Sequence, residues 1–506
     1  MWLKEGMSQG PTTKSPEQSA LLEEPAIEQP QQPEQKGMGR FVSPRPFRPW
    51  QPEQGQLLPQ YTREALGEGH LSCFFADLTG VLDFSPILRS YTQECGQPPY
   101  HPVMMTLLLM YAYARGITSS REIERRCETD LAFRYLSAGE RPDHDTLCTF
   151  RVRHLEAFGA LFVDTLRVAT QAGLKKVGHL SVDGTKVKAN ASKHKAMSYG
   201  RMDEAMRTLN EQVKKLLEEA AAIDAEEDRL YGRGRRGDEL PEELKNPAIR
   251  AERLKQAKRQ LEADKKVALA AEKEKRLKKI RRAKQDLEQE AKDKAEQKGQ
   301  PAEEAKPEPK AQKNFTDPDS RIMPRAGSFQ QSYNAQVAVD ADTQLILAQA
   351  VGQSPNDARQ LEPMVEQVKA NTGLLPKELS ADSGYFCRED IEQVQAKGVE
   401  PFVALGRSKH GQEPVAAPRG RPPKGLSFKQ RMQRKLQTKK GRQAYARRKV
   451  TAEPVIGQVK NTILKGFSLR SLGKVRGEFS LACAVHNLKK LWKQAWVLPT
   501  LSAVAA

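Results

Sequence analysis

The chain has 506 residues and a formal net charge of +19, with 83 lysines and arginines against 64 aspartates and glutamates. This excess of basic residues favours a polyanionic partner. The mean hydropathy of −0.68 argues against a membrane protein, and the longest apolar run, residues 103–114, is too short to span a bilayer. The six cysteines never approach CxxC spacing, so we expect neither a zinc site nor a disulfide framework.

The first 40 residues are rich in Gln, Glu and Pro and contain few large apolar side chains. Such a segment buries too little surface to offset its ordering entropy, so we expect residues 1–40 to be disordered. It also lacks the apolar core of a signal peptide, which predicts a cytosolic protein without a membrane partner.

A helical domain is predicted over residues 41–165. Pro102 can open a helix that ends near Gly116. Ser119, with a glutamate three residues later, predicts a capping box for a second helix that continues to about residue 139. A third helix is expected to start at Asp143 or Asp145. The arginines of these helices suit either a DNA-binding unit or an ordinary helical domain with solvated side chains; they are Arg121, Arg125, Arg126, Arg134, Arg151 and Arg153.

A charged insertion is predicted over residues 202–313. Its apolar positions alternate spacings of four and three, the pattern of a coiled-coil seam. A second helical stretch, residues 249–287, carries Leu254 and Leu261 on one stripe. We expect a helical hairpin, or a helix that pairs with another subunit, followed by a solvated linker over 290–313. The seam positions are Met202, Met206, Leu209, Val213, Leu216, Ala220 and Ile223.

About five strands with helices between them predict an α/β unit, which the insertion interrupts after its first strand. A helix is expected at 389–397. The strand segments are 180–182, 333–339, 345–351, 378–381 and 401–404.

Three acidic motifs lie far apart on the chain. Asp183 and Asp382 each follow a strand-like stretch and come shortly before a glycine, and Glu453 lies in RRKVTAEPVIGQVK. Carboxylates on rigid elements are suitable ligands for hard cations, and three of them can hold a pair of Mg²⁺ ions. An aspartate before glycine is, however, most often a turn former. The acidic and amide residues read only as turn residues are Asp340, Asp342, Asn356 and Asp357.

The most basic stretch is 411–450, with thirteen lysines and arginines against one acid, 13 − 1 = +12. Such a density is typical of a solvated segment or of a track for polyphosphate, and we favour the track. Within it, RGRPP at 419–423 is similar to an AT-hook core, whose arginines enter a narrow minor groove. The residues predicted to bind DNA are Arg419, Arg421, Arg431, Arg434, Lys435, Lys439 and Lys440.

The ordered motifs resemble the DDE transposases of bacterial insertion sequences, in the group with a helical N-terminal domain before an RNase H-like core. The resemblance covers most of residues 41–490 and rests on the stretch 100–158, SVDGTKVKANAS, SYNAQVAVD, SADSGYF, AEPVIGQVK and ACAVHNLKKL. It implies an N-terminal DNA-binding domain, a catalytic core formed by 166–201 and 314–490, and a tail over 491–506.

The resemblance also implies site residues. Asp183, Asp382 and Glu453 would be the catalytic metal ligands for two Mg²⁺ ions, for which Mn²⁺ can substitute. The residues implied as supporting are Tyr445, Arg448, Lys449 and Lys460; Lys449 is included because the spacing from Arg448 to Glu453 is one residue longer than the family's usual pattern.

Two neighbouring residues bear on the geometry of Glu453, and a second glutamate competes with it as the third ligand. Lys460 lies two helical turns after Glu453, on the same face of a continuous helix. Pro454 disfavours helical geometry at the residue before it, which predicts a helix start or a kink. Glu478 is the rival third carboxylate. His486 and Asn487 also match the family and are expected to be packed or capping residues rather than catalytic ones.

The function implied is a transposase that binds the terminal inverted repeats and target as double-stranded DNA and carries out Mg²⁺-dependent strand cleavage and strand transfer. It would act in the bacterial cytoplasm at the nucleoid, and it can form a homo-oligomer on DNA. Two alternatives remain: an RNase H-like nuclease that does not transpose, and a domesticated DNA-binding protein without catalysis.

Overall fold

The structure, a computed structural model, describes residues 62–494 except for 68, 93–97, 174–176, 232–246, 298, 303–304, 326, 407–416, 419 and 424. The predicted disordered tail, the end of the C-terminal tail and Arg419 therefore lie outside the described residues. No helix in the described ranges is long and apolar enough to cross a membrane. The five cysteines within them, Cys73, Cys127, Cys148, Cys387 and Cys483, are all free thiols.

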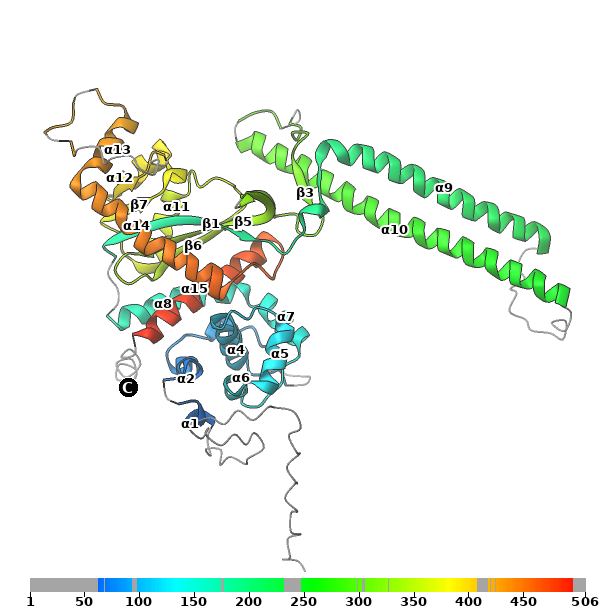
Figure 1. Ribbon diagram of the computed structural model, residues 1–506, viewed down its shortest axis with the longest axis horizontal. Helices are drawn as coiled ribbons and strands as arrows, with labels where there is room; N and C mark the ends of the chain where they lie inside the picture. Colours follow the sequence, from blue (N-terminus) through cyan, green and yellow to red (C-terminus); the bar gives the residue numbers. More distant parts are fainter. Residues whose placement is uncertain are drawn as a thin grey trace, which may run out of the picture. The chain divides into compact units, whose positions relative to one another are not determined.

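A mixed sheet forms the centre of the described chain (Figure 1). Its order is β4-β5-β1-β7-β8, with β6 also paired to β5. The long β5 runs antiparallel to β1, whereas β7 is parallel to β1 and β8 is parallel to β7. The predicted α/β class is confirmed. The strands are β1 (His179–Lys188), β4 (Arg321–Arg325), β5 (Ser328–Asp340), β6 (Ile346–Gly352), β7 (Glu378–Ala381) and β8 (Glu400–Val403).

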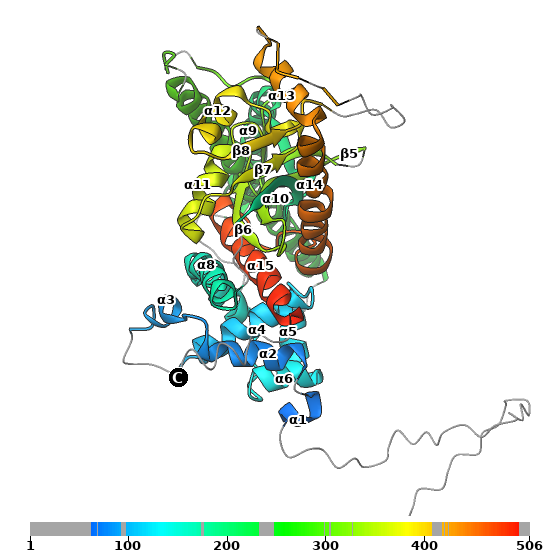
Figure 2. The ribbon, with the colours of Figure 1, turned by 90° about the vertical axis from the view of Figure 1, so that its left-hand side faces the viewer.

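Helices cover both faces of this sheet. Figure 2 shows α14 on one side of β7 and β8, with α11 and α12 on the other. The last helix, α15, packs against β6 through Asn487, whose side chain exchanges hydrogen bonds with both backbone groups of Ile346. The helices are α11 (Leu361–Thr372), α12 (Arg388–Ala396), α13 (Phe428–Gln437), α14 (Lys439–Gln458), the π-helical turn η6 (Val459–Ile463) and α15 (Leu472–Lys493).

Eight α-helices precede β1 in the described ranges, and they differ from the predictions in two places. Ser119 precedes α5 but its side chain makes no capping hydrogen bond, so the predicted capping box is wrong. The predicted second helix is two helices, because Asp130 adopts an extended conformation and caps α6. Asp143 caps α7, as expected. The helices are α1 (Thr62–Leu66), α2 (Leu71–Asp77), α3 (Ser85–Leu88), α4 (Pro102–Ala114), α5 (Ser120–Thr129), α6 (Leu131–Leu136), α7 (His144–Arg153) and α8 (Leu155–Gln171).

Helix α8 joins this helical region to the sheet by packing against α15. The approach is close at Gly477, where an added Cβ would lie 2.6 Å from the Cβ of Leu155. Only a glycine fits there, since such a contact is far inside van der Waals distance. The predicted domain boundary at residue 165 falls inside α8, which is continuous.

The insertion forms a helical hairpin of α9 (Tyr199–Tyr231) and α10 (Pro247–Gln297), which lie side by side in Figure 1. Contacts from Lys284 to Asp203 and from Lys266 to Glu219 show that the helices are antiparallel, because one number rises as the other falls. Each predicted seam position of α9 is buried or half-buried.

The second half of the insertion corrects two predictions. Leu261 is 54% exposed, so it does not belong to the buried stripe of α10. That stripe contains Leu277 and Ile280, and buried alanines continue it in both directions. The solvated linker predicted over 290–313 is partly helix and strand. Helix α10 extends to Gln297, and β3 (Gln312–Asn314) pairs with β2 (Ala196–Ser198) at the base of the hairpin.

Candidate active site

Asp183 and Asp382 lie on neighbouring strands at the same edge. The parallel pairing of β1 and β7 ends at Val182 and Ala381, and each aspartate is the next residue along the chain. Asp382 follows β7, as predicted. Asp183 does not end its strand: β1 continues to Lys188, because β5 still pairs with it on the other side. Asp183 is therefore held inside a strand and is only 8% exposed.

Helix α14 brings Glu453 to Asp183 through one arginine. Arg448 Nη1 donates to Asp183 Oδ2 at 2.8 Å, and Arg448 Nη2 donates to Glu453 Oε1 at 3.0 Å. The arginine is itself largely buried, and its guanidinium lies 5.8 Å from the ring centre of Tyr445. Lys449, the alternative supporting residue, is exposed. Arg448 is therefore the basic residue that contacts the carboxylates, despite the longer spacing.

Burial dominates the electrostatics of Asp183. It raises the pKa of this carboxyl from its ordinary value of 3.8 to about 6, since a buried charge loses its hydration. The Arg448 guanidinium opposes this change in pKa, whereas the negative charges of Asp382 and Glu453 add to it. The negative charges of Asp382 and Glu453 therefore act on Asp183, and this favours the binding of further positive charge.

Pro454 lies inside α14, so the predicted helix start is wrong, and the alternative, a kink, stays a prediction. Without an N–H, it cannot bond the carbonyl four residues earlier, which belongs to Val450. Gln344 Nε2 donates to this carbonyl at 3.0 Å. The backbone of Gln344 in turn accepts a contact from His486 Nε2 at 3.2 Å. The sheet and α15 thus stabilise the helix where the proline weakens it, and His486 has the packed role that was expected.

Lys460 lies near the same edge. It belongs to the π-helical turn that follows α14, and its Nζ donates to Thr185 Oγ1 at 2.8 Å. Thr185 is two residues after Asp183 on β1, so both side chains are on one face of the sheet. A π-helical turn is rare and occurs frequently at functional sites. The structure therefore brings the predicted lysine to the strand of the first aspartate.

Sequence reasoning missed the role of Asp357, which it read as a turn residue. Its Oδ1 accepts hydrogen bonds from Asn334 Nδ2 and Gln336 Nε2, both at 2.6 Å. An added Cβ at Gly184 would lie 2.9 Å from Asp357 Oδ1, and one at Gly384 would lie 3.0 Å from its Oδ2. The glycines that follow both motif aspartates therefore leave room for this carboxylate. Gly184 and Gly384 are therefore the sequence feature that could have indicated a further side chain packed beside the two aspartates.

Glu478, the rival third carboxylate, is fully buried elsewhere. It accepts hydrogen bonds from the backbone N–H groups of Ser468 and Leu469 and from the hydroxyl of Tyr113. These bonds connect α15 to α4 and to the loop before α15. Glu478 thus has a structural set of partners, and Glu453 is the glutamate that shares an arginine with Asp183.

The residues predicted to bind DNA separate into two groups. Lys435 and Lys440 form ion pairs with Glu400 and hold α13 and α14 against β8. Arg434 donates to the carbonyl of Gly420 at 3.0 Å. Arg421, Arg431 and Lys439 are exposed, and Lys440 is exposed as well despite its ion pairs. Among the arginines of the N-terminal helices, Arg121 and Arg134 are exposed, while Arg126 is paired with Glu122 and Arg151 is buried.

A metal site is not preassembled in the described ranges, where no three Asp, Glu, His or Cys side chains are close enough to hold an ion. The chemistry of the donors nevertheless fits a hard cation. A guanidinium already lies between Asp183 and Glu453 and contacts both. Three carboxylates and this arginine leave a formal charge of −3 + 1 = −2, and carboxylate oxygens are the ligands that Mg²⁺ prefers.

Two family models match the chain. One, described as Transposase domain (DUF772), matches residues 61–153; the other, described as Transposase DDE domain, matches 310–488. The first covers the helices up to α7. The second contains Asp382 and Glu453 and is consistent with an RNase H-like core, while Asp183 lies before the insertion and outside both matches. No curated protein and no solved structure matches the chain.

Proposed function

Because the chain belongs to the DDE transposases of bacterial insertion sequences, we propose that it binds the ends of its element as double-stranded DNA, cuts there and joins the freed 3′-hydroxyl to target DNA. The observation that carries this proposal is the shared contact of Arg448 with Asp183 and Glu453. This contact joins Glu453 of helix α14 to Asp183 of strand β1, 270 positions earlier, and Asp382 directly follows the neighbouring strand β7.

We assign Asp183, Asp382 and Glu453 as ligands of two Mg²⁺ ions, for which Mn²⁺ can substitute. When bound there, the metal supplies a Lewis acid for in-line displacement at phosphorus. Water attacks in the first step and the DNA 3′-hydroxyl in the second, so one site serves both and needs no covalent nucleophile from the protein.

The surrounding side chains have separate tasks in this proposal. Asp183 must be ionised to act as a ligand. The Lys460 ammonium, beside Thr185, holds a phosphate next to the scissile one. Tyr445 contacts Arg448 and fixes its position. The exposed Arg431 and Lys439 contact the DNA backbone. Arg419 and Arg421 enter a narrow minor groove.

A cleavage assay tests the proposal directly. DNA that carries the element's flanking genomic ends is incubated with the protein in Mg²⁺ or in EDTA, and both cleaved and joined products are measured. A transposase acting in the cytoplasm at the nucleoid gives both products in Mg²⁺ and neither in EDTA. Cleavage without joining would indicate the nuclease alternative, and binding without cleavage would indicate the domesticated DNA-binding protein.

A further inference from the structure

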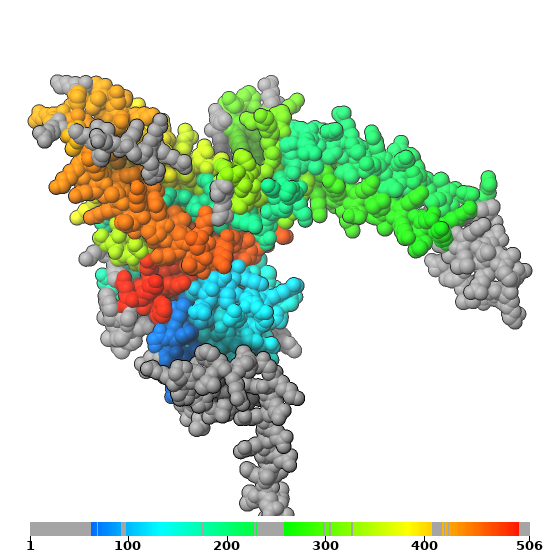
Figure 3. Space-filling view, in the orientation of Figure 1, coloured from blue at the N-terminus to red at the C-terminus, as the bar shows by residue number. Residues whose placement is uncertain are grey.

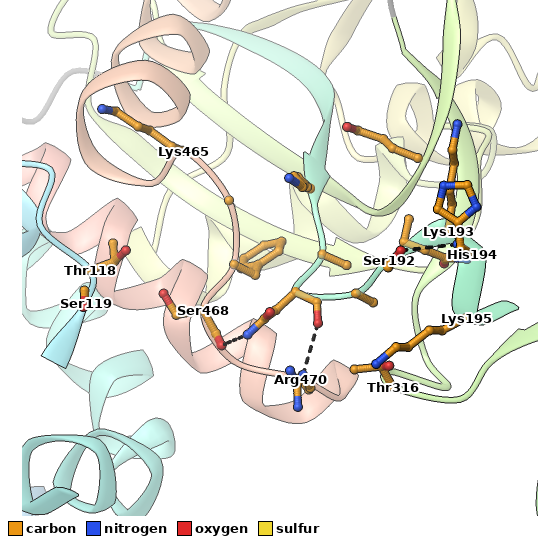
Figure 4. Close-up of a pocket in the computed structure, with 18 of the residues that line it drawn as sticks. Thr118, Ser119, Ser192, Lys193, His194, Lys195, Thr316, Lys465, Ser468 and Arg470 are labelled. Atoms are coloured by element: carbon orange, nitrogen blue, oxygen red, sulfur yellow. Dashed lines mark hydrogen bonds between the residues drawn. The ribbon is translucent and has the colours of Figure 1, made fainter. Parts of the chain in front are cut away.

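A large basic pocket lies where β1 ends (Figure 4). Asp183, Asp382 and Glu453 are not among its lining residues. Its volume is about 1010 Å³. Its walls include the loop before α5, the end of β1 with the segment after it, the start of β5, and the loop between η6 and α15. We call it the basic pocket, and its basic lining residues are Arg151, Lys188, Lys193, His194, Lys195, Lys465 and Arg470.

The exposed cations of the basic pocket have no carboxylate among the residues that line it. None of its 21 lining residues is an aspartate or a glutamate. Lys188, Lys193, Lys195, Lys465 and Arg470 are exposed, and in the described ranges none of them forms an ion pair. Lys435 and Lys440 of the same protein are, in contrast, paired with carboxylates. Five cations around one hollow repel each other, and an anionic ligand offsets this cost.

The walls of the pocket are rigid where the cations are attached. The backbone N–H of Phe467 donates to the carbonyl of Lys188 at 2.9 Å, which joins the two basic walls. Arg470 Nε donates to the Asn190 carbonyl at 3.1 Å, and Asn190 Nδ2 donates to the Ser468 carbonyl at 2.6 Å. Buried Glu478 fixes the same loop from behind. A site held in this way does not need to order itself on binding.

Two elements lead from the carboxylates to the basic pocket. Strand β1 runs from Asp183 to Lys188, and α14 with η6 runs from Glu453 towards Lys465. The hydrogen bond from Lys460 to Thr185 joins the two elements between these ends. Figure 3 shows the surface of this C-terminal segment meeting that of the N-terminal helices, and an added Cβ at Gly116 would lie 2.6 Å from the carbonyl oxygen of Thr462.

The length of β1 gives an estimate of the distance between the carboxylates and the basic pocket. Five residues of strand span about 17 Å, and duplex DNA rises by about 3.4 Å per base pair, so the pocket lies roughly five base pairs from the carboxylates. We propose that the basic pocket binds the phosphodiester backbone of the element-end duplex about five base pairs from the cut. This inference rests on the proposed function, since it takes the cut DNA as the ligand. Lys188, Lys465 and Arg470 then position the duplex, while Lys460 acts nearer the reacting phosphate.

The test combines a protein variant with a DNA variant. The triple variant Lys188→Gln, Lys465→Gln, Arg470→Gln removes three pocket charges. Its matched control, Lys275→Gln, Lys278→Gln, Lys279→Gln, removes three exposed charges from α10. Each lost phosphate contact should flatten the slope of log K against log salt by about 0.9, so the pocket variant loses about 2 to 3 units of slope and the control keeps the wild-type value. Circular dichroism checks that both variants are folded.

The location is tested with neutral methylphosphonates, placed singly along the element-end duplex. Replacement four to six base pairs from the cut should weaken binding by the wild-type protein several-fold and binding by the triple variant not at all. An unchanged salt slope in the triple variant, or equal methylphosphonate effects in both proteins, overturns the proposal. Failure of the proposed function is a different result, because the wild-type protein then does not cut the duplex in Mg²⁺.

Discussion

Arg448 donates a hydrogen bond to Asp183 across 265 positions of sequence, and this contact joins helix α14 to strand β1 at the edge where Asp382 follows β7. The arginine also reaches Glu453, so one cation balances two carboxylates from different elements. In the metal-free protein the arginine offsets the repulsion between Asp183, which is buried, and Glu453, which is exposed. This arrangement also means that the charge of the site depends on a contact between two motifs that lie far apart in the sequence.

Neutralising each carboxylate should abolish Mg²⁺-dependent cleavage and leave DNA binding largely intact. The variants are Asp183→Asn, Asp382→Asn and Glu453→Gln, and the reason is that charge at these positions holds metal while the phosphate contacts lie elsewhere. Cleavage and electrophoretic mobility shift are measured on the same DNA. Glu478→Gln should instead lose stability, because Glu478 accepts buried backbone hydrogen bonds. Full cleavage by Glu453→Gln would show that the third ligand is another residue.

Removing the bridging arginine should destabilise the metal-free protein. Arg448→Gln leaves the buried Asp183 carboxylate without its ion-pair partner, which typically costs roughly 1–3 kcal/mol. Lys449→Gln is the matched control, because that side chain is exposed, and it should change the free energy of unfolding by less than about 0.5 kcal/mol. Urea unfolding in EDTA measures both. Equal stability of the two variants would contradict a structural role for the arginine.

The raised pKa of Asp183 predicts a pH dependence of known sign. With a folded pKa of about 6 against an ordinary value of 3.8, the folded protein keeps a proton that the unfolded chain has lost. The contribution of Asp183 to stability is therefore present at low pH and falls by up to about 3 kcal/mol as the pH rises through the window from about 4 to 6. Cleavage should fall below pH 6, because the protonated carboxyl cannot bind a cation.

Urea unfolding of the metal-free protein at several pH values measures the contribution of Asp183 to the free energy of unfolding. The stability of Asp183→Asn relative to wild type should increase as the pH rises through that window. Asp145→Asn, whose carboxylate is 90% exposed, controls for the loss of one negative charge. A pH-independent difference between Asp183→Asn and wild type would rule out the raised pKa.

Filling the space beside Asp357 should damage catalysis more than folding. In Gly184→Ala the new methyl group would lie within 3 Å of the Asp357 carboxylate, which must move away from Gln336. We expect cleavage to fall by about 10²-fold, the usual result of a displacement of about 1 Å near a reacting centre. Gly473→Ala is the control, because nothing lies within 4 Å of its Cβ position. Asp357→Asn should retain more activity than Asp357→Ala; the reverse order would show that packing alone matters.

The sequence was most informative where structure is local. The strand before Asp382, the cap at Asp143 and the seam of α9 depend on a few neighbouring residues, and each was predicted. Prediction was poorer where a distant partner decides. The glycine after Asp183 led us to predict that the strand ends at this aspartate. In the structure β1 continues to Lys188, because β5 pairs with it over that length.

Two further features needed the folded chain. The spacing of four residues through Cys127 and Leu131 indicates one helix, but the pattern cannot show that Asp130 is extended and caps a new one. Asp357 read as a turn residue because its partners, Asn334 and Gln336, come from a strand and not from its own loop. The three acidic motifs and Arg448 could be named from the sequence, whereas the contacts of that arginine and the place of the fourth carboxylate, Asp357, depend on tertiary structure.

The helical hairpin should unfold without loss of the catalytic sheet. Its cross-helix contacts bury Leu209 of α9 and Ile280 of α10 in a small cluster separate from the main core. Lysines at both positions place two charges in that cluster, which should melt α9 and α10 and reduce helicity. Leu217→Lys is the matched control, since that leucine is 48% exposed and should accept the charge. Circular dichroism and limited proteolysis report on the hairpin, and Mg²⁺-dependent cleavage of a single element end reports on the core.

Two outcomes would contradict this prediction. Unchanged protease sensitivity in the double variant would show that the seam does not hold the hairpin together. Loss of single-end cleavage would show that the sheet depends on the hairpin.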